Sequence, residues 1–177
     1  MRLGDRVFNV IVAVVRFFER RGSDAGEFDS PPEAREIPNR FTIIPDDYHA
    51  EFAGTARDGR QFFVTQLFEM DNEFVATFLW RPDGSFDSIE VEEFGARGSF
   101  DAETLESARA GHLAALSPFR FEPITVAPFS VEYHGSTFGF VARAPEKDDE
   151  DAIAVVELLP GNFMAYYWPW DGEGYDT

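Results

Sequence analysis

The chain has 177 residues, close to the usual size of one domain and long enough to bury a core without crosslinks. Its 33 acidic residues outnumber the 15 basic ones, and the resulting formal net charge of -18 repels the phosphate backbone of nucleic acids. There is no cysteine, which excludes disulfides, thiolate zinc sites and cysteine nucleophiles.

Apolar residues make up 44% of the chain and include 20 phenylalanines, enough to fold despite the charge. We expect a single cytoplasmic domain spanning residues 1–177, since the lack of cysteine is compatible with a reducing compartment. The acidity has two explanations at this point. It serves binding to a basic partner, or it is an adaptation to a high-salt cytoplasm in which carboxylates stay hydrated.

Residues 1–22 are predicted to form an N-terminal helix packed on a sheet. After a capping Asp5, apolar residues recur at helical spacing from Val7 to Phe18. This stretch is too short to span a membrane. An amphipathic membrane-surface anchor is the alternative, because residues 1–22 contain five arginines: Arg2, Arg6, Arg16, Arg20 and Arg21. The acidity of the whole chain works against membrane binding. Its many β-branched residues also leave a strand open.

Residues 23–39 are rich in Ser, Asp, Glu and Pro and are predicted to form an extended connector. Residues 40–98 form the first β-half. Its short runs of Phe, Val, Ile and Thr are separated by turn sequences at Asp58-Gly59, Asp71-Asn72 and Pro82-Asp83-Gly84. We expect an antiparallel meander with strands at about 40–44, 48–55, 61–70, 73–81 and 85–94.

Residues 99–117 are predicted to form a central helix, with Ser99 or Asp101 as its cap and its end before Pro118. Its apolar stripe is Leu105, Ala108, Leu113 and Leu116. Residues 118–177 form the second β-half, with strands at about 120–127, 130–135, 137–143, 153–159 and 162–168. The predicted fold class is α+β, mainly antiparallel β-sheet with an N-terminal helix and one central helix.

The two β-halves contain an internal echo. Residues 73–78 align without gaps with residues 162–167, and the same register places 86–88 opposite 175–177. Upstream, residues 51–54 match residues 132–135 if the turn at Asp58-Gly59 is lengthened into the acidic loop 146–151. We interpret the pattern as two duplicated β-meander halves, with coincidence between aromatic-rich strands as the alternative.

Sequence motifs of known chemistry are missing. The chain has no His-Glu-x-x-His pair, no Gly-x-Ser-x-Gly elbow and no phosphate-binding glycine loop. We therefore predict no catalytic residue, no metal site and no cofactor. Of the three histidines, His112 lies close to the apolar stripe of the central helix, where a partly buried, hydrogen-bonded imidazole is expected. The carboxylates of Glu90, Glu92 and Glu93 are expected to be solvated on a sheet edge, which they protect from strand pairing.

The last twelve residues hold two of the three tryptophans and three of the five tyrosines. Trp and Tyr dominate binding hot spots, so the candidate binding residues are Tyr167, Trp168, Trp170, Asp171 and Tyr175, together with His134. The structural alternative is a closing strand whose aromatic face seals the core.

The leading hypothesis is a non-catalytic, acidic protein-interaction domain of the inhibitor or immunity-protein kind, with a basic protein as partner. The alternative is a small-molecule-binding or hydrolase-like protein with an aromatic pocket between the two β-halves. The sequence carries no signal for oligomeric state.

Overall fold

The computed structural model describes residues 31–177 except 70, 97, 134, 146–151 and 162–163. The predicted N-terminal helix lies outside the described residues. Within them the structure is mainly antiparallel β-sheet with one α-helix, α2 (Ala102–Leu116), and one short 3-10 helix, η1 (Pro32–Arg35). The strands are β1 (Phe41–Ile43), β2 (Phe52–Ala56), β3 (Gln61–Phe68), β4 (Glu73–Trp80), β5 (Phe86–Gly95), β6 (Phe119–Phe121), β7 (Ile124–Val126), β8 (Val131–Tyr133), β9 (Ser136–Arg143), β10 (Val155–Leu159), β11 (Ala165–Tyr166) and β12 (Tyr175–Asp176).

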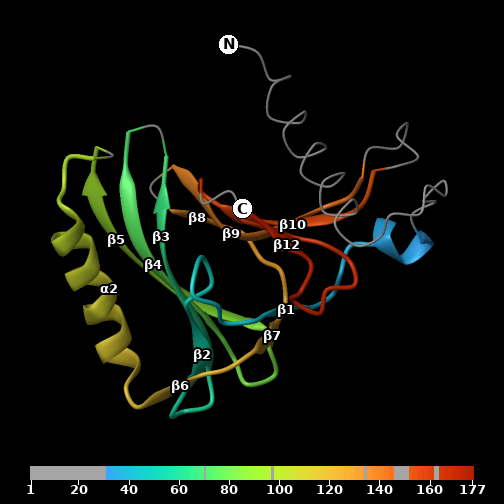
Figure 1. Ribbon diagram of the computed structural model, residues 1–177, viewed down its shortest axis with the longest axis horizontal. Helices are drawn as coiled ribbons and strands as arrows, with labels where there is room; N and C mark the ends of the chain where they lie inside the picture. The colour runs from blue at the N-terminus through green and yellow to red at the C-terminus, as the bar shows by residue number, and fades with distance from the viewer. Residues whose placement is uncertain (1–30, 70, 97, 134, 146–151, 162–163) are drawn as a thin grey trace.

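The first sheet has the strand order β5-β4-β3-β2-β6 (Figure 1). Strands β2 to β5 are neighbours in chain order and are joined at the three predicted turns, so the meander is confirmed for these four strands. The strand predicted at 40–44, β1, lies outside this sheet. β6, which follows α2, returns to pair with β2. Gly54 is required at this contact, because a Cβ there would lie 2.0 Å from the carbonyl oxygen of Arg120.

The second sheet has the order β12-β11-β10-β9-β8, and β9 to β12 are again neighbours in chain order. The strand predicted at 120–127 is wrong in one respect: it is divided into β6 and β7, with Glu122 and Pro123 between them. Proline has no N–H to donate to a ladder, which explains the break. β7 then pairs with β1 in a separate two-stranded sheet.

The proposed internal repeat can be compared with the strand order. The match of 73–78 with 162–167 puts β4 against β11, and the match of 86–88 with 175–177 puts β5 against β12, the last strand of each meander. The match of 51–54 with 132–135 puts β2 against β8 and is out of step with the others, because one strand separates β2 from β4 whereas two strands separate β8 from β11. Duplication stays a prediction.

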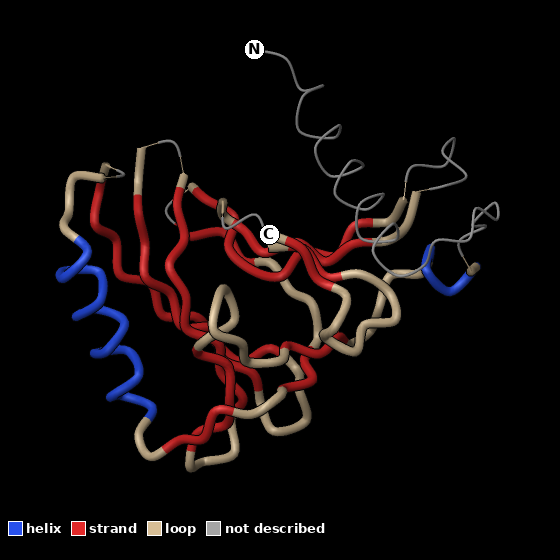
Figure 2. Tube along the Cα trace, viewed as in Figure 1, coloured by secondary structure: helices blue, strands red, loops and turns tan. Residues whose placement is uncertain are grey.

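The core lies between the two five-stranded sheets, and β4 is at its centre. All eight residues of β4 are buried. Alternation along the strand sends one set of side chains, Phe74, Ala76, Phe78 and Trp80, towards the second sheet, and the other set, Val75, Thr77 and Leu79, towards α2. The layers are therefore α2, the first sheet and the second sheet (Figure 2).

Aromatic rings fill the space between the sheets. Phe140 on β9 lies within 5.2–6.1 Å, centroid to centroid, of five rings from both sheets and β1: Phe41, Phe63, Phe78, Trp80 and Tyr166. The indole N–H of Trp80 donates to the carbonyl oxygen of Ala127 at 3.0 Å, so the one polar atom of this side chain is satisfied.

The central helix α2 begins where the sequence predicts. The carboxylate of Asp101 accepts the backbone N–H of Thr104 at 2.8 Å, which makes Asp101 the N-cap. Hydrogen bonds from the hydroxyl and backbone of Thr104 hold the pKa of Asp101 below its ordinary value. The helix ends at Leu116, two residues before Pro118, and Leu105 and Leu116 are buried against the first sheet.

Candidate functional site

The aromatic C-terminal segment forms one edge of the second sheet. β11 pairs with β10 on one side and with β12 on the other. Tyr166 is buried in the core and stacks on Tyr175, with ring centroids 5.5 Å apart. Trp170 and Tyr175 are half-buried and pack against the same core.

The other predicted site residues are more scattered. Tyr167 is buried on the opposite face of the sheet from Tyr166, Trp168 is half-buried and Asp171 is exposed. His134 lies outside the described residues. The structure thus places Trp170 and Tyr175 against the same core, and the segment closes that core while Trp168 and Trp170 stay partly exposed.

The turn between β11 and β12 is fastened to β1. The backbone of Trp170 has a φ of 68°, its N–H donates to the carbonyl oxygen of Tyr167 at 3.0 Å, and its own carbonyl accepts the N–H of Thr42 at 2.8 Å. A Cβ at Gly172, where φ is +90°, would lie 2.7 Å from the side chain of Ile44. The turn is therefore in direct contact with the chain that follows β1.

That following chain is a loop of residues 44–51, which carries a feature the sequence reasoning missed. One carboxylate oxygen of Asp46 accepts the backbone N–H groups of Tyr48, His49 and Ala50, each at 2.9 Å. Such side-chain bonds offer the backbone an alternative to a strand ladder. The strand predicted at 48–55 is therefore wrong at its start, and β2 begins only at Phe52.

Tyr48 stands on this loop with 75% of its surface exposed, the highest value among the large apolar side chains that the structure describes as exposed. Its ring meets that of His49 edge to face, with centroids 4.0 Å apart. Asp46 is half-buried, and Asp47 is exposed. The run Pro45-Asp46-Asp47 was the available signal, since Asp in this position favours turns.

The two loops together form what we call the acidic-aromatic surface: Asp46, Asp47, Tyr48, Trp168, Trp170 and Asp171. The bond between Thr42 and Trp170 and the contact of Gly172 with Ile44 hold the loops together. Burial raises the pKa of Tyr166, and the negative charge of Asp46 raises it further. Carboxylates beside Tyr and Trp rings suit a guanidinium or ammonium group, through ion pairing and cation–π contact.

A second polar arrangement lies between α2 and the first sheet. The Nδ1 atom of His112 is 2.7 Å from the hydroxyl of Thr77, and its Nε2 atom is 3.7 Å from a carboxylate oxygen of Glu92. Hydroxyl, imidazole and carboxylate in a row suggest nucleophilic catalysis. However, Thr77 is 1% exposed and covered by α2, so a substrate does not reach it. The partly buried, hydrogen-bonded imidazole expected for His112 is confirmed.

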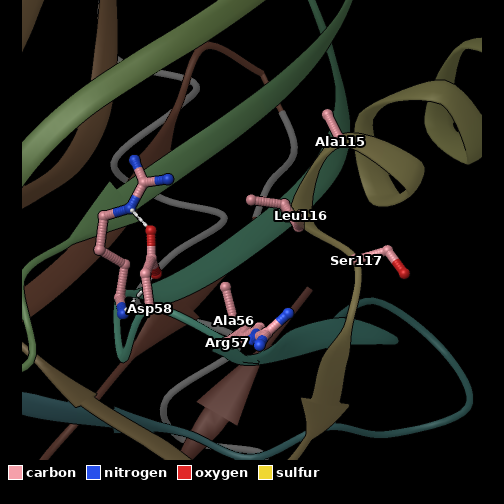
Figure 3. Close-up of a pocket in the computed structure, with 7 residues that line it drawn as sticks. Ala56, Arg57, Asp58, Ala115, Leu116 and Ser117 are labelled. Atoms are coloured by element: carbon pink, nitrogen blue, oxygen red, sulfur yellow. Dashed lines mark hydrogen bonds and ion pairs between the residues drawn. The ribbon is translucent and has the colours of Figure 1, made fainter.

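A shallow hollow of about 330 Å³ lies between the β2–β3 turn and the end of α2 (Figure 3). Its lining is Ala56, Arg57, Asp58, Arg60, Ala115, Leu116 and Ser117. Arg60 is held by Asp58 at 2.7 Å and lies 3.7 Å from Asp87. None of the predicted site residues lines this hollow.

Within the described part of the chain, no three His, Asp or Glu side chains are grouped as a metal site, and no helix is long and apolar enough to cross a membrane. Comparison with known proteins found no matching family model, no matching curated protein and no matching solved structure.

Replacing His112 with Leu leaves the buried hydroxyl of Thr77 without its partner. We expect a loss of about 1–3 kcal/mol in the free energy of unfolding, measured by urea denaturation. Adding Thr77→Val in the same chain should recover part of that loss, because both polar groups are then gone. A double variant that loses the sum of the two single losses would show that the Thr77–His112 bond contributes nothing.

Two tyrosines should resist ionisation in the folded protein. Burial is the main cause of the raised pKa of Tyr166 and Tyr167, and for Tyr167 the charges of Asp176 and Glu157 add to it. A raised pKa means that the folded state keeps these protons, so their contribution to stability is present below about pH 10 and is lost as the pH rises above it.

An ultraviolet absorbance titration should show a late ionisation that coincides with alkaline unfolding. Tyr167→Phe should reduce the amplitude of this late phase, and the urea-unfolded chain should lack the phase altogether. A late phase of unchanged amplitude in Tyr167→Phe would contradict the burial of this side chain.

Proposed function

We propose that this chain is a non-catalytic protein-interaction domain whose acidic-aromatic surface binds a basic segment of a partner protein. The observation that carries the proposal is Tyr48, a three-quarters exposed ring on a loop held by three hydrogen bonds to Asp46. Single exposed apolar residues are ordinary on protein surfaces. This ring, however, is on a loop whose backbone is held by Asp46, next to the exposed Asp47, and pre-ordering lowers the entropic cost of binding.

The mode of recognition follows from the side chains. An arginine or lysine of the partner lies against the ring of Tyr48 or Trp170, and the carboxylates of Asp47 and Asp171 pair with its charge. The net charge of -18 steers a basic partner towards the chain at long range. A partner inhibited or neutralised in this way fits the inhibitor or immunity-protein kind of function.

A second group of carboxylates provides a matched control. Glu90, Glu92 and Glu93 are exposed on β5, the edge strand of the first sheet. Charge on an edge strand prevents pairing with another sheet, which explains these residues without a ligand. They lie on the opposite five-stranded sheet from β11 and β12, so generic attraction to acid and recognition by the two loops are separable.

Titration of the protein with a short arginine-rich peptide at low salt should move the amide NMR signals of residues 46–48 and 168–171 more than those of 90–93. Tyr48→Ala should lower the affinity for the peptide by roughly tenfold, as expected for an aromatic hot spot. Asp47→Asn should weaken it more than Glu90→Gln, which removes the same charge from the edge strand.

The opposite outcome is equal signal changes over all acidic surfaces, with Tyr48→Ala and Glu90→Gln both binding the peptide like the unaltered chain. This outcome would show that the peptide binds through overall negative charge alone. The proposed site would then be wrong. High salt should weaken the specific complex through its charged contacts and slow its association.

Small-molecule binding is the alternative function, and the hollow at the end of α2 is the observation that favours it. The space between the two sheets, where the sequence suggested an aromatic pocket, is occupied by packed rings such as Phe78 and Phe140. The hollow carries the exposed side chain of Arg57, which suits a small carboxylate or phosphate. A thermal-shift response to such anions that Arg57→Ala abolishes and Tyr48→Ala preserves would favour this alternative.

A further inference from the structure

The second sheet has an apolar cluster on the face that points away from the core. Its described members, which we call the outer apolar face, are Ile153, Val155, Ala165 and Tyr167. Alternation explains their direction, because Val156 and Tyr166, the neighbours of Val155 and Tyr167, belong to the core between the sheets. The outer apolar face is therefore a second hydrophobic surface of the same sheet.

These side chains are buried to a degree that a bare sheet face does not give. Val155 is 9% exposed, Ala165 is 7% exposed and Tyr167 is 5% exposed. A large side chain on a sheet face reaches such values only when other atoms pack over it. Of the two helices in the described residues, α2 covers the first sheet and η1 lies beside the start of β10 (Figure 1).

The position of η1 shows where the preceding chain arrives. The carbonyl oxygen of Ala34 accepts the N–H of Ala154 at 2.8 Å, and a guanidinium nitrogen of Arg35 donates to the carbonyl oxygen of Ala152 at 2.8 Å. The first described residue, Pro31, is only three residues before Ala34. The chain that precedes it therefore arrives next to the start of β10, where Ile153 and Val155 lie. Thirty residues precede it, and they include the apolar stretch from Val7 to Phe18.

We propose that residues 1–22 pack on the outer apolar face as the chain's own cover for it. The segment has the stripe that such a face requires, since six of its apolar residues share one side of a helix: Val7, Val10, Ile11, Val14, Val15 and Phe18. Twelve helical residues extend about 18 Å, the width of about four strands. The residues between Phe18 and Pro31 reach roughly 40 Å when extended, so the chain is long enough.

Charge complementarity supports the same occupant. Glu157 and Asp176 are both register partners of Ala165, in the middle of the outer apolar face. Arg143 already pairs with Glu157. The stretch from Arg2 to Arg21 carries five arginines in this otherwise acidic chain, which suits a face bordered by carboxylates. The inference goes beyond the proposed partner surface, because it assigns a second binding surface to a segment of the same chain.

The absence of cysteine allows a direct test in the full-length protein. A thiol introduced by Ala165→Cys on the outer apolar face should react slowly with a thiol reagent. Adding Val14→Asp, which places a charge in the apolar stripe, should accelerate the reaction by about tenfold or more, as for a locally opened site. Asn9→Asp adds the same charge on the opposite side of the segment and should leave the rate unchanged.

A second thiol separates uncovering from unfolding. Ala53→Cys lies in the core between the sheets, where Ala53 is 0% exposed, and should stay slow in both charge variants. Equal rates at Ala165→Cys in the Val14→Asp and Asn9→Asp chains would overturn the proposal, and so would an equal acceleration at both thiols. Co-sedimentation of the unaltered chain with anionic vesicles, together with a freely reactive Ala165→Cys thiol, would also overturn it and identify a membrane anchor.

Discussion

Burial of β4 on both faces is the constraint on which the rest of the structure depends. Its eight residues have no solvent-facing side, since α2 covers one face and the second sheet covers the other. Each polar group on such a strand needs an internal partner. The backbone groups are paired with β3 and β5, and the hydroxyl of Thr77 is paired with His112. What resembles a catalytic arrangement is therefore a consequence of burying a polar strand position.

The same constraint decides where charge and aromatic surface remain available. Both faces of the first sheet are covered, one by α2 and the other by the second sheet. The exposed carboxylates of β5 therefore lie at the edge of the sheet. The C-terminal aromatic segment has two roles, because Tyr166 and Tyr175 complete the core while the turn at Trp170 is bonded to Thr42, which leads to the loop of Tyr48. The proposed binding at this surface would therefore use residues next to ones that stabilise the fold.

Much of the fold could be predicted from local sequence chemistry. Turn residues such as Asp58-Gly59 and Pro82-Asp83-Gly84 set the meander, Asp101 and Pro118 mark the limits of α2, and the glutamates of β5 mark an edge strand. Each of these signals depends on a few neighbouring residues, so it can be interpreted from a single sequence. The break at Pro123 had an equally local signal, the proline itself, but the strand was predicted to continue through it from 120 to 127.

The candidate site was less predictable, because its parts meet only in the folded chain. The carboxylate of Asp46 accepts three backbone N–H groups that the predicted strand would have used in its ladder. Residue propensities do not decide between these two sets of hydrogen bonds. Tyr48 is not part of an alternating or helical pattern of apolar residues, so the sequence did not indicate its exposed position. Trp170 was selected for its residue type, but its attachment to Thr42 joins positions far apart in sequence.

Native-state hydrogen exchange measures the central claim most directly. If β4 is held between α2 and the second sheet, its amides from Val75 to Leu79 should be among the slowest in the protein and should exchange only through global unfolding. The amides of the edge strands β6 and β8 should exchange through smaller openings. Amides of β4 that exchange as fast as those of β8 would contradict the account, because the strand would not then be enclosed on both faces.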